Sequence, residues 1–513
     1  MKEFNTTGLC NPNKHYMVDI SGKLDYIKTL IKKEKYFIIN RPRQFGKTTI
    51  LYFLQRELSD EYLVLNISFE GIGDRAFIDE ERFVNEFIDI IKESLEYIDE
   101  ELIEKLTILS KDIESFLDLS KVISKFIKSV NKEVILIIDE VDKSTNNQLF
   151  LNFLGMLRNK YLQREAGKGF TFKSVILSGV YDVKNLKLKL RPDEERKYNS
   201  PWNIAVPFNI DMSLSQKGIE EMLNEYKNDR NIELDTKKVS EFIYYYTNGY
   251  PFFVSRICQI IDEDLNATWN EETLLRSIKM LLSESNTLFD DLIKNIENYK
   301  ELKEYMFNLI MNGIDLSFNI DSSTINLGHI FGYFRNENGK VKISNRIFEQ
   351  RLYNYFSCEV ESIASLSGYN IKSNFIKGNG LDIEKILLSF QQFMREQYSK
   401  RDEKFLERHG RLLFLAFIKP IINGVGFDFK EPQTSEEKRL DVVIVYNNHK
   451  YIIELKIWRG DSYYQKGLKQ LADYLEDNKQ DKGYLLVFDF NEGKQYKRED
   501  LVVEGKKIVA VFT

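Results

Sequence analysis

Three adjacent residues near the start of the chain, Gly46, Lys47 and Thr48, have the chemistry needed to bind a nucleoside triphosphate. Glycine lets backbone N–H groups point inward at phosphate oxygens, lysine reaches the outer phosphates, and a threonine hydroxyl can hold magnesium at a helix N-terminus. The same three residues also occur in ordinary surface turns. Here residues 36–39 form an apolar run that predicts a strand, and residues 49–58 have apolar side chains at helical spacing. This strand–loop–helix context favours a phosphate-binding loop.

The whole loop departs from the G-x-x-x-x-G-K-[ST] pattern at one position, where Arg41 replaces the first glycine. This substitution puts the usual loop geometry in doubt. We nevertheless expect the following residues to contribute to the nucleotide site: Arg41, Pro42, Arg43, Gln44, Phe45, Gly46, Lys47, Thr48 and Thr49.

Two acidic residues, Asp139 and Glu140, follow the run of five aliphatic residues at 134–138. Such a run is typical of a parallel strand that is covered on both faces. Asp139 at its end could bind magnesium and Glu140 could polarise the attacking water. A core strand that ends in solvated acids is the alternative, and the upstream phosphate loop argues against it. The next apolar run ends at Ser178, a candidate for contact with the γ-phosphate.

A second group of charged residues, Asp441, Glu454 and Lys456, lies near the C-terminus on two β-rich runs around Asn447-Asn448. If a two-residue hairpin joins the runs, Asp441 pairs with Glu454, and both project to the same face as Lys456. Two carboxylates at that distance favour a divalent metal between them, and the lysine could position water. Cross-strand salt bridges on an exposed hairpin would explain the same charges.

Further residues could complete this second site. Glu407 lies upstream, in the helical pattern of residues 405–418, and could add a metal ligand. Gln470 and Tyr474 lie downstream at i, i+4 spacing and therefore share a helix face.

Composition constrains the remaining possibilities. The chain has 513 residues, which suggests three or four domains, and a net charge of −6, which disfavours a generally basic nucleic-acid coat. Its three cysteines lie far apart, which argues against a disulfide framework and a cysteine zinc site. No stretch has the ~18 apolar residues of a membrane span, and no signal peptide is recognisable. We therefore expect a cytoplasmic protein without a membrane helix.

The elements that position these residues follow from periodicity. Strands are expected at residues 36–39, 63–69, 134–138, 172–177 and 204–208, with helices at 81–97 and 116–130, which together predict a parallel α/β sheet. Helical patterns dominate residues 215–356, which contain a hairpin-like turn at Asn336-Glu337-Asn338-Gly339. A boundary is expected within residues 357–380, before a new helix near Ile383 and a mixed α/β pattern.

With these motifs the sequence resembles bacterial and archaeal proteins in which an AAA-ATPase-like domain is fused to a C-terminal PD-(D/E)XK nuclease-like domain. The resemblance covers nearly the whole chain. It rests on residues 15–19, on the loop at 41–49, on Ile138-Asp139-Glu140, on Ile343-Ser344-Asn345 and on the C-terminal charged group. Leu440 stands where many nucleases of this kind have proline, which weakens recognition from the motif alone.

The resemblance implies a P-loop NTPase parallel sheet with an extra strand between the phosphate-loop strand and the Asp139 strand, then a helical and winged-helix-like region, then a restriction-endonuclease-like α/β domain. The expected domains are residues 1–212 (AAA-like ATPase core), 213–290 (helical lid), 291–370 (winged-helix-like) and 371–513 (nuclease-like). It implies catalytic roles for Glu140, Asp441, Glu454, Lys456 and Gln470, with Thr48, Asp139, Asp441, Glu454 and, less securely, Glu407 as metal ligands.

The leading hypothesis is therefore an ATP-binding and ATP-hydrolysing protein, dependent on Mg²⁺, whose nucleotide state controls a nuclease acting on DNA or RNA. The alternative is a nucleotide-dependent switch or scaffold whose nuclease-like domain binds nucleic acid or protein without cutting it. The intact Asp441, Glu454 and Lys456 favour cleavage. The sequence leaves the substrate and the oligomeric state open.

Overall fold

The structure is a computed structural model of the chain. It describes residues 2–96, 98–141, 148–180, 202–208, 210–266, 268–310, 316–364, 375–397, 426–429, 442–446, 449–491 and 494–513, together with Phe414, Phe417 and Ile418. These residues form two compact units, Met1–Leu302 with Ser317–Phe348, and Lys303–Leu316 with Glu349–Thr513. The four expected domain ranges stay predictions.

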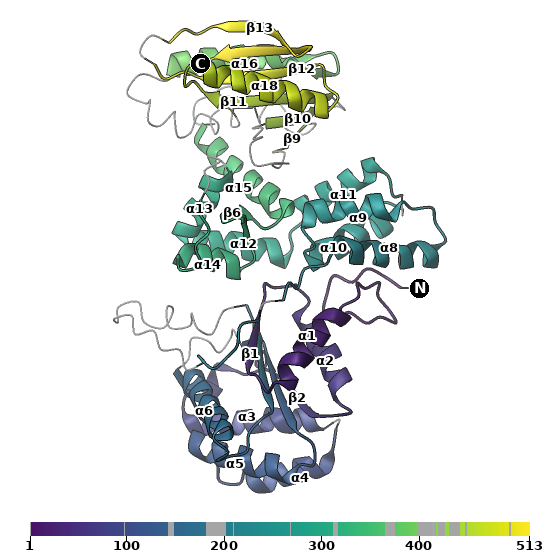
Figure 1. Ribbon diagram of the computed structural model, residues 1–513, viewed down its shortest axis with the longest axis vertical. Helices are drawn as coiled ribbons and strands as arrows, with labels where there is room; N and C mark the ends of the chain where they lie inside the picture. Colours follow the sequence, from purple (N-terminus) through teal and green to yellow (C-terminus); the bar gives the residue numbers. More distant parts are fainter. Residues whose placement is uncertain are drawn as a thin grey trace. The chain divides into compact units, whose positions relative to one another are not determined.

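A four-stranded parallel sheet forms the centre of the first unit (Figure 1). Its strands are β1 (Phe37–Asn40), β2 (Leu63–Ser68), β3 (Val134–Asp139) and β4 (Ser174–Gly179), in the order β1-β4-β3-β2. The predicted parallel sheet is confirmed, and β4 is the extra strand between β1 and β3. Since all four strands run the same way, the residues that follow them meet at one edge.

The fifth expected strand, residues 204–208, is wrong as a strand. Only Val206 pairs with β1, through a single parallel bridge to Phe37. A turn closed by the bond from the Ala205 N–H to the Trp202 carbonyl precedes it, and the Phe208 side chain packs among the helices on one face of the sheet. The segment is fixed mainly by burial of its apolar side chains. These buried side chains give it the apolar pattern of a strand although it forms no ladder.

Helices cover both faces of this sheet (Figure 1). On one face lie α1 (Ser21–Lys32) and α2 (Lys47–Leu58), and on the other lie α3 (Glu80–Leu95), α4 (Glu100–Leu109), α5 (Phe116–Ser129) and α6 (Gln148–Glu165), with the short turn η1 (Asp74–Phe77). Every residue of β3 is buried, as expected for a strand between two helical layers. The predicted helices at 81–97 and 116–130 correspond to α3 and α5.

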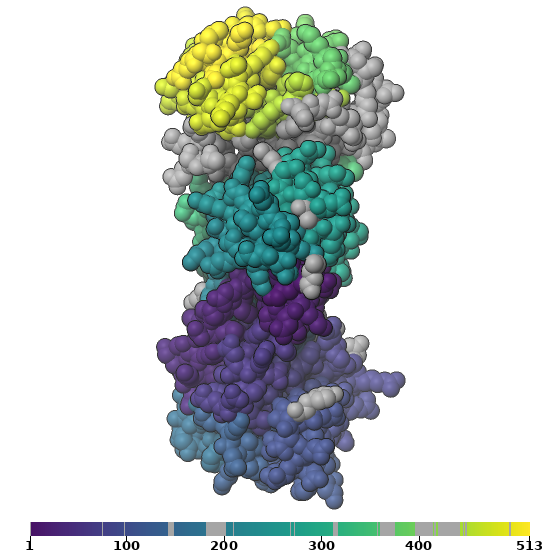
Figure 2. Space-filling view, turned by 90° about the vertical axis from the view of Figure 1, so that its right-hand side faces the viewer, coloured from purple at the N-terminus to yellow at the C-terminus, as the bar shows by residue number. Residues whose placement is uncertain are grey.

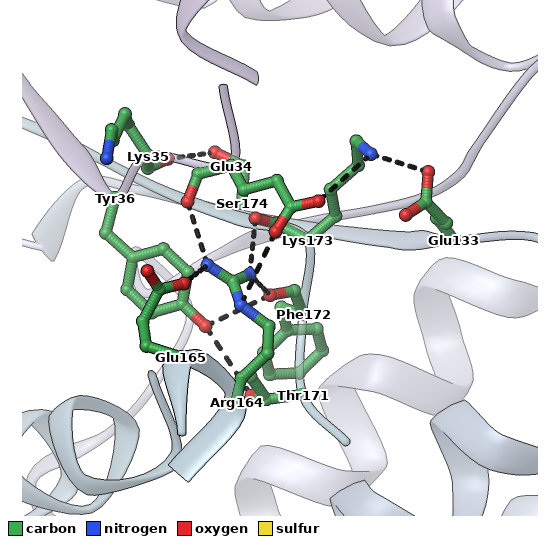
Figure 3. Close-up of polar contacts among 10 residues, drawn as sticks. All are labelled: Glu34, Lys35, Tyr36, Glu133, Arg164, Glu165, Thr171, Phe172, Lys173 and Ser174. Atoms are coloured by element: carbon green, nitrogen blue, oxygen red, sulfur yellow. Dashed lines mark hydrogen bonds and ion pairs between the residues drawn. The ribbon is translucent and has the colours of Figure 1, made fainter. Parts of the chain in front are cut away.

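Arg164, at the end of α6, ties together the edge of the sheet where the strands begin (Figure 3). Its guanidinium donates to the carbonyls of Phe172 and Lys173 at 2.8 Å and to that of Glu34 at 3.0 Å. The same group lies 5.0 Å from the centre of the Tyr161 ring. This edge is opposite the one at which the phosphate loop follows β1.

The rest of the first unit is mainly helical. It contains α8 (Gln216–Arg230), α9 (Thr236–Thr247), α10 (Pro251–Gln259), the π-turn η4 (Ile260–Asp264), α11 (Glu271–Ser283), α12 (Thr287–Asn298) and α14 (Ser323–Ile330), while α13 (Lys300–Ile310) and α15 (Arg346–Ala364) run into the second unit. The predicted hairpin is confirmed, because β5 (Phe334–Glu337) and β6 (Lys340–Ile343) pair antiparallel around Asn338 and Gly339. Both turn residues have positive φ, 52° and 79°, as a two-residue hairpin turn requires.

The N-terminal segment lies against these helices (purple beside teal in Figure 2). Lys2 pairs with Glu225 and the Tyr16 hydroxyl donates to Asp229 at 2.5 Å, both on α8. Tyr16 also stacks edge-on against Tyr226, with 5.3 Å between ring centres.

A six-stranded mixed sheet forms the second unit, in the order β13-β14-β12-β11-β10-β9. The strands are β9 (Gly426–Phe429), β10 (Val442–Tyr446), β11 (His449–Ile457), β12 (Lys482–Phe488), β13 (Arg498–Val503) and β14 (Lys506–Phe512), with a small separate pair, β7 (Ile376–Lys377) and β8 (Gly380–Leu381). Helix α18 (Asp461–Asp477) packs on one face, and α16 (Ile383–Gln397) packs on the other through Phe390 and Phe488. The predicted helix near Ile383 is α16.

Within the ranges that the structure describes, no helix is both long and apolar enough to cross a membrane.

Candidate functional site: a phosphate loop and a charged cluster

The loop between β1 and α2 has the backbone that a phosphate site needs. Gly46 is the N-cap of α2 and has a left-handed conformation with φ 79° and ψ 15°. A Cβ there would meet no atom within 4 Å, so the conformation itself accounts for the glycine. The helix N-terminus that follows directs free N–H groups and a positive dipole end toward the loop.

Lys47 occupies the inside of this loop. Its ammonium donates to the carbonyls of Arg41 and Pro42, at 3.0 Å each, and the residue is only 7% exposed. A buried ammonium that is held by neutral carbonyls can exchange them for phosphate oxygens, which carry charge and bind it more strongly.

Thr48 and Asp139 come together across the sheet edge although they are far apart in the chain. The Thr48 hydroxyl donates to Oδ2 of Asp139 at 3.3 Å, and Asp139 is buried at the end of β3. A hydroxyl and a carboxylate are oxygen ligands of the kind that magnesium prefers. The two side chains therefore fit a magnesium ion that would also bind phosphate.

Glu140 follows Asp139 with a positive φ of 54°. This conformation is unfavourable for a glutamate and costs about 1–2 kcal/mol. Its N–H bonds to the Asp139 carboxylate at 3.0 Å, which fixes the turn at the end of β3. Backbone strain of this kind is concentrated at functional sites.

Ser178 lies next to the loop strand, paired with Ile39 across the β1–β4 ladder. It is fully buried, and its hydroxyl has no hydrogen-bond partner among the described residues. An unpaired buried hydroxyl is costly, so a ligand at this edge would satisfy it.

Arg41, which replaces the first glycine of the pattern, holds the start of the loop in place. Its backbone N–H donates to the carbonyl of Gly179, and its guanidinium donates to the carbonyls of Phe208, at 3.2 Å, and Ile210. The guanidinium also lies 5.2 Å from the Phe208 ring, and its burial lowers the pKa of Arg41. The side chain thus anchors the loop to a neighbouring segment, a role that the sequence did not indicate.

Residues from the helical part of the same unit contact the outer side of the loop. The hydroxyl of Tyr250, whose pKa burial raises, donates to the Arg43 carbonyl at 2.7 Å, and the Tyr250 ring packs edge-on against Phe45. On α12, Asp291 pairs with Arg43 at 3.2 Å and Thr287 accepts from Gln44 at 3.3 Å. The final loop residue, Thr49, accepts from the Cys10 N–H at 3.3 Å.

These contacts were not predicted. The sequence signal at this point is Gly249-Tyr250-Pro251, which predicts a break between two helical patterns and no contact with the loop.

The predicted C-terminal hairpin has the expected register. Tyr446 pairs with His449 and Val442 pairs with Ile453, so the position opposite Glu454 is the one that precedes Val442. That position is Asp441, which lies outside the described residues, as does Glu407. The predicted Asp441–Glu454 pairing therefore stays a prediction.

Glu454, Lys456 and Gln470 do come together. Lys456 Nζ lies 3.0 Å from Oε1 of Glu454 and 3.3 Å from Oε1 of Gln470 on α18. Glu454 is 1% exposed, and a buried carboxylate is stable only with cations or hydrogen-bond donors around it. The cluster is partly buried between β11 and α18. The alternative explanation from the sequence was a salt bridge on an exposed hairpin.

Gly467 and Tyr474 complete the surroundings of this cluster. A Cβ on Gly467 would lie 3.3 Å from Cε of Lys456, so the glycine leaves room for the lysine stem to cross the helix. The Tyr474 hydroxyl is buried and lacks a hydrogen-bond partner in the described part of the chain. Among those same residues no group of three or more His, Cys, Asp or Glu side chains could by itself hold a metal ion.

The sheet order, the left-handed glycine before α2 and the paired Thr48 and Asp139 define the class: the first unit has the α/β fold of P-loop nucleoside triphosphatases. A family model described as "AAA-like domain" matches residues 10–357, about two thirds of the chain. The protein belongs to this family.

The other comparisons are more distant. A search of curated protein sequences finds no match. A Walker-type ATPase of Pyrococcus abyssi is similar in structure, with TM-score 0.46 and 11% identity over 68% of this chain and 99% of that chain. The ORC2 protein of Aeropyrum pernix, in ADPNP–ADP complexes, has TM-score 0.35 and 10% identity over 66% and 94%. The ORC1 protein of the same organism, in complex with DNA, has TM-score 0.30 and 13% identity over 67% and 94%.

Proposed function

We propose that the protein binds ATP with magnesium at the β1–α2 loop and hydrolyses it. The observation that carries this proposal is the approach of the Thr48 hydroxyl to the buried Asp139 carboxylate, 3.3 Å apart, next to the Lys47 ammonium in the loop. These are the side chains that ATP hydrolysis needs, and they come from the start of α2 and the end of β3, which meet at one sheet edge.

In this proposal Thr48 and Asp139 hold the magnesium ion, which neutralises phosphate charge when bound. Lys47 exchanges the loop carbonyls for phosphate oxygens. Glu140 orients the attacking water and takes its proton, while the new P–O bond forms and the bond to the ADP oxygen breaks. Ser178 donates its free hydroxyl to the transferred phosphoryl group.

Nucleotide binding and turnover by purified variants test this proposal. Lys47→Ala is expected to abolish binding of a fluorescent ATP analogue, and Glu140→Gln to retain binding but lose at least tenfold in turnover. Lys105→Ala is the control, since Lys105 forms an exposed ion pair with Glu101 on α4. Unchanged binding by Lys47→Ala would contradict the assignment of the loop.

For the second unit we propose a PD-(D/E)XK-type nuclease site that uses a divalent metal to cleave phosphodiesters in DNA or RNA. Support comes from the partly buried contacts of Lys456 with Glu454 and Gln470. Glu454 and Asp441 would hold the metal. Lys456 would position the water and stabilise charge on the phosphate, with Gln470 orienting the lysine.

The nuclease assay uses single- and double-stranded DNA and RNA, with magnesium or manganese, with and without ATP. Asp441→Ala and Glu454→Ala should each abolish cleavage. The control is Glu476→Ala, which removes an exposed residue of α18 that forms an ion pair with Lys506, and it should leave cleavage unchanged. Cleavage that survives both active-site changes would refute the nuclease. Binding of nucleic acid without cleavage by the wild type would favour the alternative, a nucleotide-dependent switch or scaffold.

Coupling between the two sites is a separate part of the proposal. If the nucleotide state controls the nuclease, Lys47→Ala should remove the ATP dependence of cleavage and leave the ATP-independent rate unchanged.

A further inference from the structure

An exposed aromatic ring lies beside the charged cluster of the second unit. Tyr463, in the first turn of α18, is 41% exposed, and its ring centre is 5.5 Å from Nζ of Lys456. Helix α18 lies on one face of the sheet that contains Glu454 (Figure 1). The ring is therefore next to the lysine that we propose for phosphodiester cleavage.

The neighbouring residue, Tyr464, has a structural role and is a useful comparison for Tyr463. Tyr464 is buried, packs against Trp458 and Phe512, and donates its hydroxyl to Glu499 at 2.7 Å. Tyr463 has no comparable burial. Its exposure leaves a large apolar face in contact with water, which a ligand that stacks on it would cover.

The charges around the ring select the ligand. The exposed Arg459 has its guanidinium carbon 5.9 Å from the Tyr463 ring centre, and Lys456 approaches the same ring. Lys466, also exposed, lies three residues further along α18 and so shares the helix face of Tyr463. Two acidic residues are close to these cations: Asp461, two residues before Tyr463, and the buried Glu454, which lies 3.0 Å from Nζ of Lys456. With three cations and two carboxylates, the balance of these five charges is still positive.

A flat aromatic ring among cations is suited to nucleic acid, because the ring stacks on a base and the cations contact the phosphates. In a duplex both faces of a base are already stacked on its neighbours. A ring on the surface of a helix can therefore stack only on a base that is unpaired or at a frayed end.

We propose that Tyr463 and Arg459 bind an unpaired nucleotide beside Lys456 of the nuclease-like site, so that the substrate class is single-stranded nucleic acid or a single-stranded end. The inference rests on the proposed nuclease function, but its binding step does not require cleavage.

The test is the affinity of the full chain for a fluorescein-labelled 20-nucleotide oligothymidylate and for a 20-base-pair duplex, by fluorescence anisotropy in EDTA. Tyr463→Ala and Tyr463→Leu should each weaken binding of the single strand about tenfold, the loss expected for one stacked base. Tyr463→Phe keeps the ring and should stay within twofold of the wild type. Duplex affinity should change less than twofold in all three variants.

Tyr52→Ala is the matched control, because Tyr52 is also exposed (37%) but lies on α2 in the first unit. Melting temperatures check that each variant is folded, and Tyr463→Leu, which also removes the ring, keeps the test valid if the alanine variant is unstable. Equal affinities of the wild type and Tyr463→Leu for the single strand would overturn the proposal, as would equal losses for single strand and duplex.

The two proposals fail in different ways. If Glu454-dependent cleavage is observed but Tyr463→Leu binds oligothymidylate normally, the nucleotide site is wrong and the nuclease stands. If the wild type cleaves nothing while Tyr463→Leu loses affinity for the single strand, the nuclease is wrong and the binding site stands.

Discussion

Gly332, between α14 and β5, lies so close to the phosphate loop that the methyl group of an alanine at this position should displace the loop. A Cβ at this position would lie 2.3 Å from Cγ of Pro42 and 2.9 Å from its Cβ. Carbon atoms in contact are ~3.5 Å apart, so Pro42 or the segment at Gly332 would have to move by about 1.2 Å. Gly332→Ala therefore tests whether this segment sets the position of the loop.

The chain provides a matched control for backbone strain. Gly332 has φ +76° and Gly339, in the β5–β6 turn, has φ +79°, but a Cβ on Gly339 would meet no atom within 4 Å. Both alanine substitutions should cost roughly 1 kcal/mol through the left-handed backbone. Only Gly332→Ala adds the overlap, which in a packed region costs a further ~1–3 kcal/mol.

The expected result is a lower melting temperature for both variants and a larger drop for Gly332→Ala. A displacement of about 1 Å at a catalytic loop lowers the rate on the order of 100-fold, so ATP turnover should fall by about 10- to 100-fold in Gly332→Ala and stay within twofold in Gly339→Ala. Hydrogen exchange should increase at residues 41–49 only in Gly332→Ala. If the two variants lose turnover and stability equally, the reasoning from the Pro42 contact is refuted.

Two further predictions concern stability away from the sites. Burial lowers the pKa of Lys160 on α6 to about 8, so the folded state releases this proton before the unfolded state does and stability rises with pH above 8. Between pH 7.5 and 9.5 the gain is about 2 kcal/mol; denaturant unfolding should show it in the wild type, and an equal slope in Lys160→Met would contradict it. Arg164→Ala removes the guanidinium from three carbonyls, of which that of Phe172 keeps the Tyr36 hydroxyl as a donor, and should cost about 2–3 kcal/mol in the same assay. Arg82→Ala, which removes an exposed ion pair, should cost under about 1 kcal/mol, and equal losses for these two arginines would argue against the structural role of Arg164.

Local patterns were sufficient to predict the strand, loop and helix around Lys47 and the register of the β10–β11 hairpin. Both depend on neighbours in sequence: a glycine before a helix, and two residues between two strands. Pairing Tyr446 with His449 fixes every other pair in that hairpin, because each step back along β10 is one step forward along β11, and successive residues then alternate between the two faces. The approach of Lys456 to Glu454 follows from the same alternation.

Contacts between distant parts of the chain could not be predicted in this way. Tyr250 reaches Arg43 from 207 residues away, and Gly332 reaches Pro42 from farther still. Neither residue is unusual in its own neighbourhood, since a tyrosine before a proline and a glycine after a helix both have local explanations. The strand predicted at residues 204–208 was wrong because a local pattern was misleading there. The apolar composition of this segment reflects side-chain burial on both sides of one bridging residue.

Arg41 takes part both in the local strand–loop–helix pattern and in a contact with a distant segment. In the usual pattern a glycine begins the loop, but here the Arg41 N–H continues the bonding of β1 to β4 through the Gly179 carbonyl, and the guanidinium joins β1 to the segment that contains Phe208. The first position of the loop is thus part of the sheet edge and is held from both sides. The residues that follow, Pro42, Arg43 and Phe45, lie instead against the helical region, at Gly332, Asp291 and Tyr250. Arg41 thus joins the start of the loop to the sheet, whereas the residues after it are held by the helical region of the same unit.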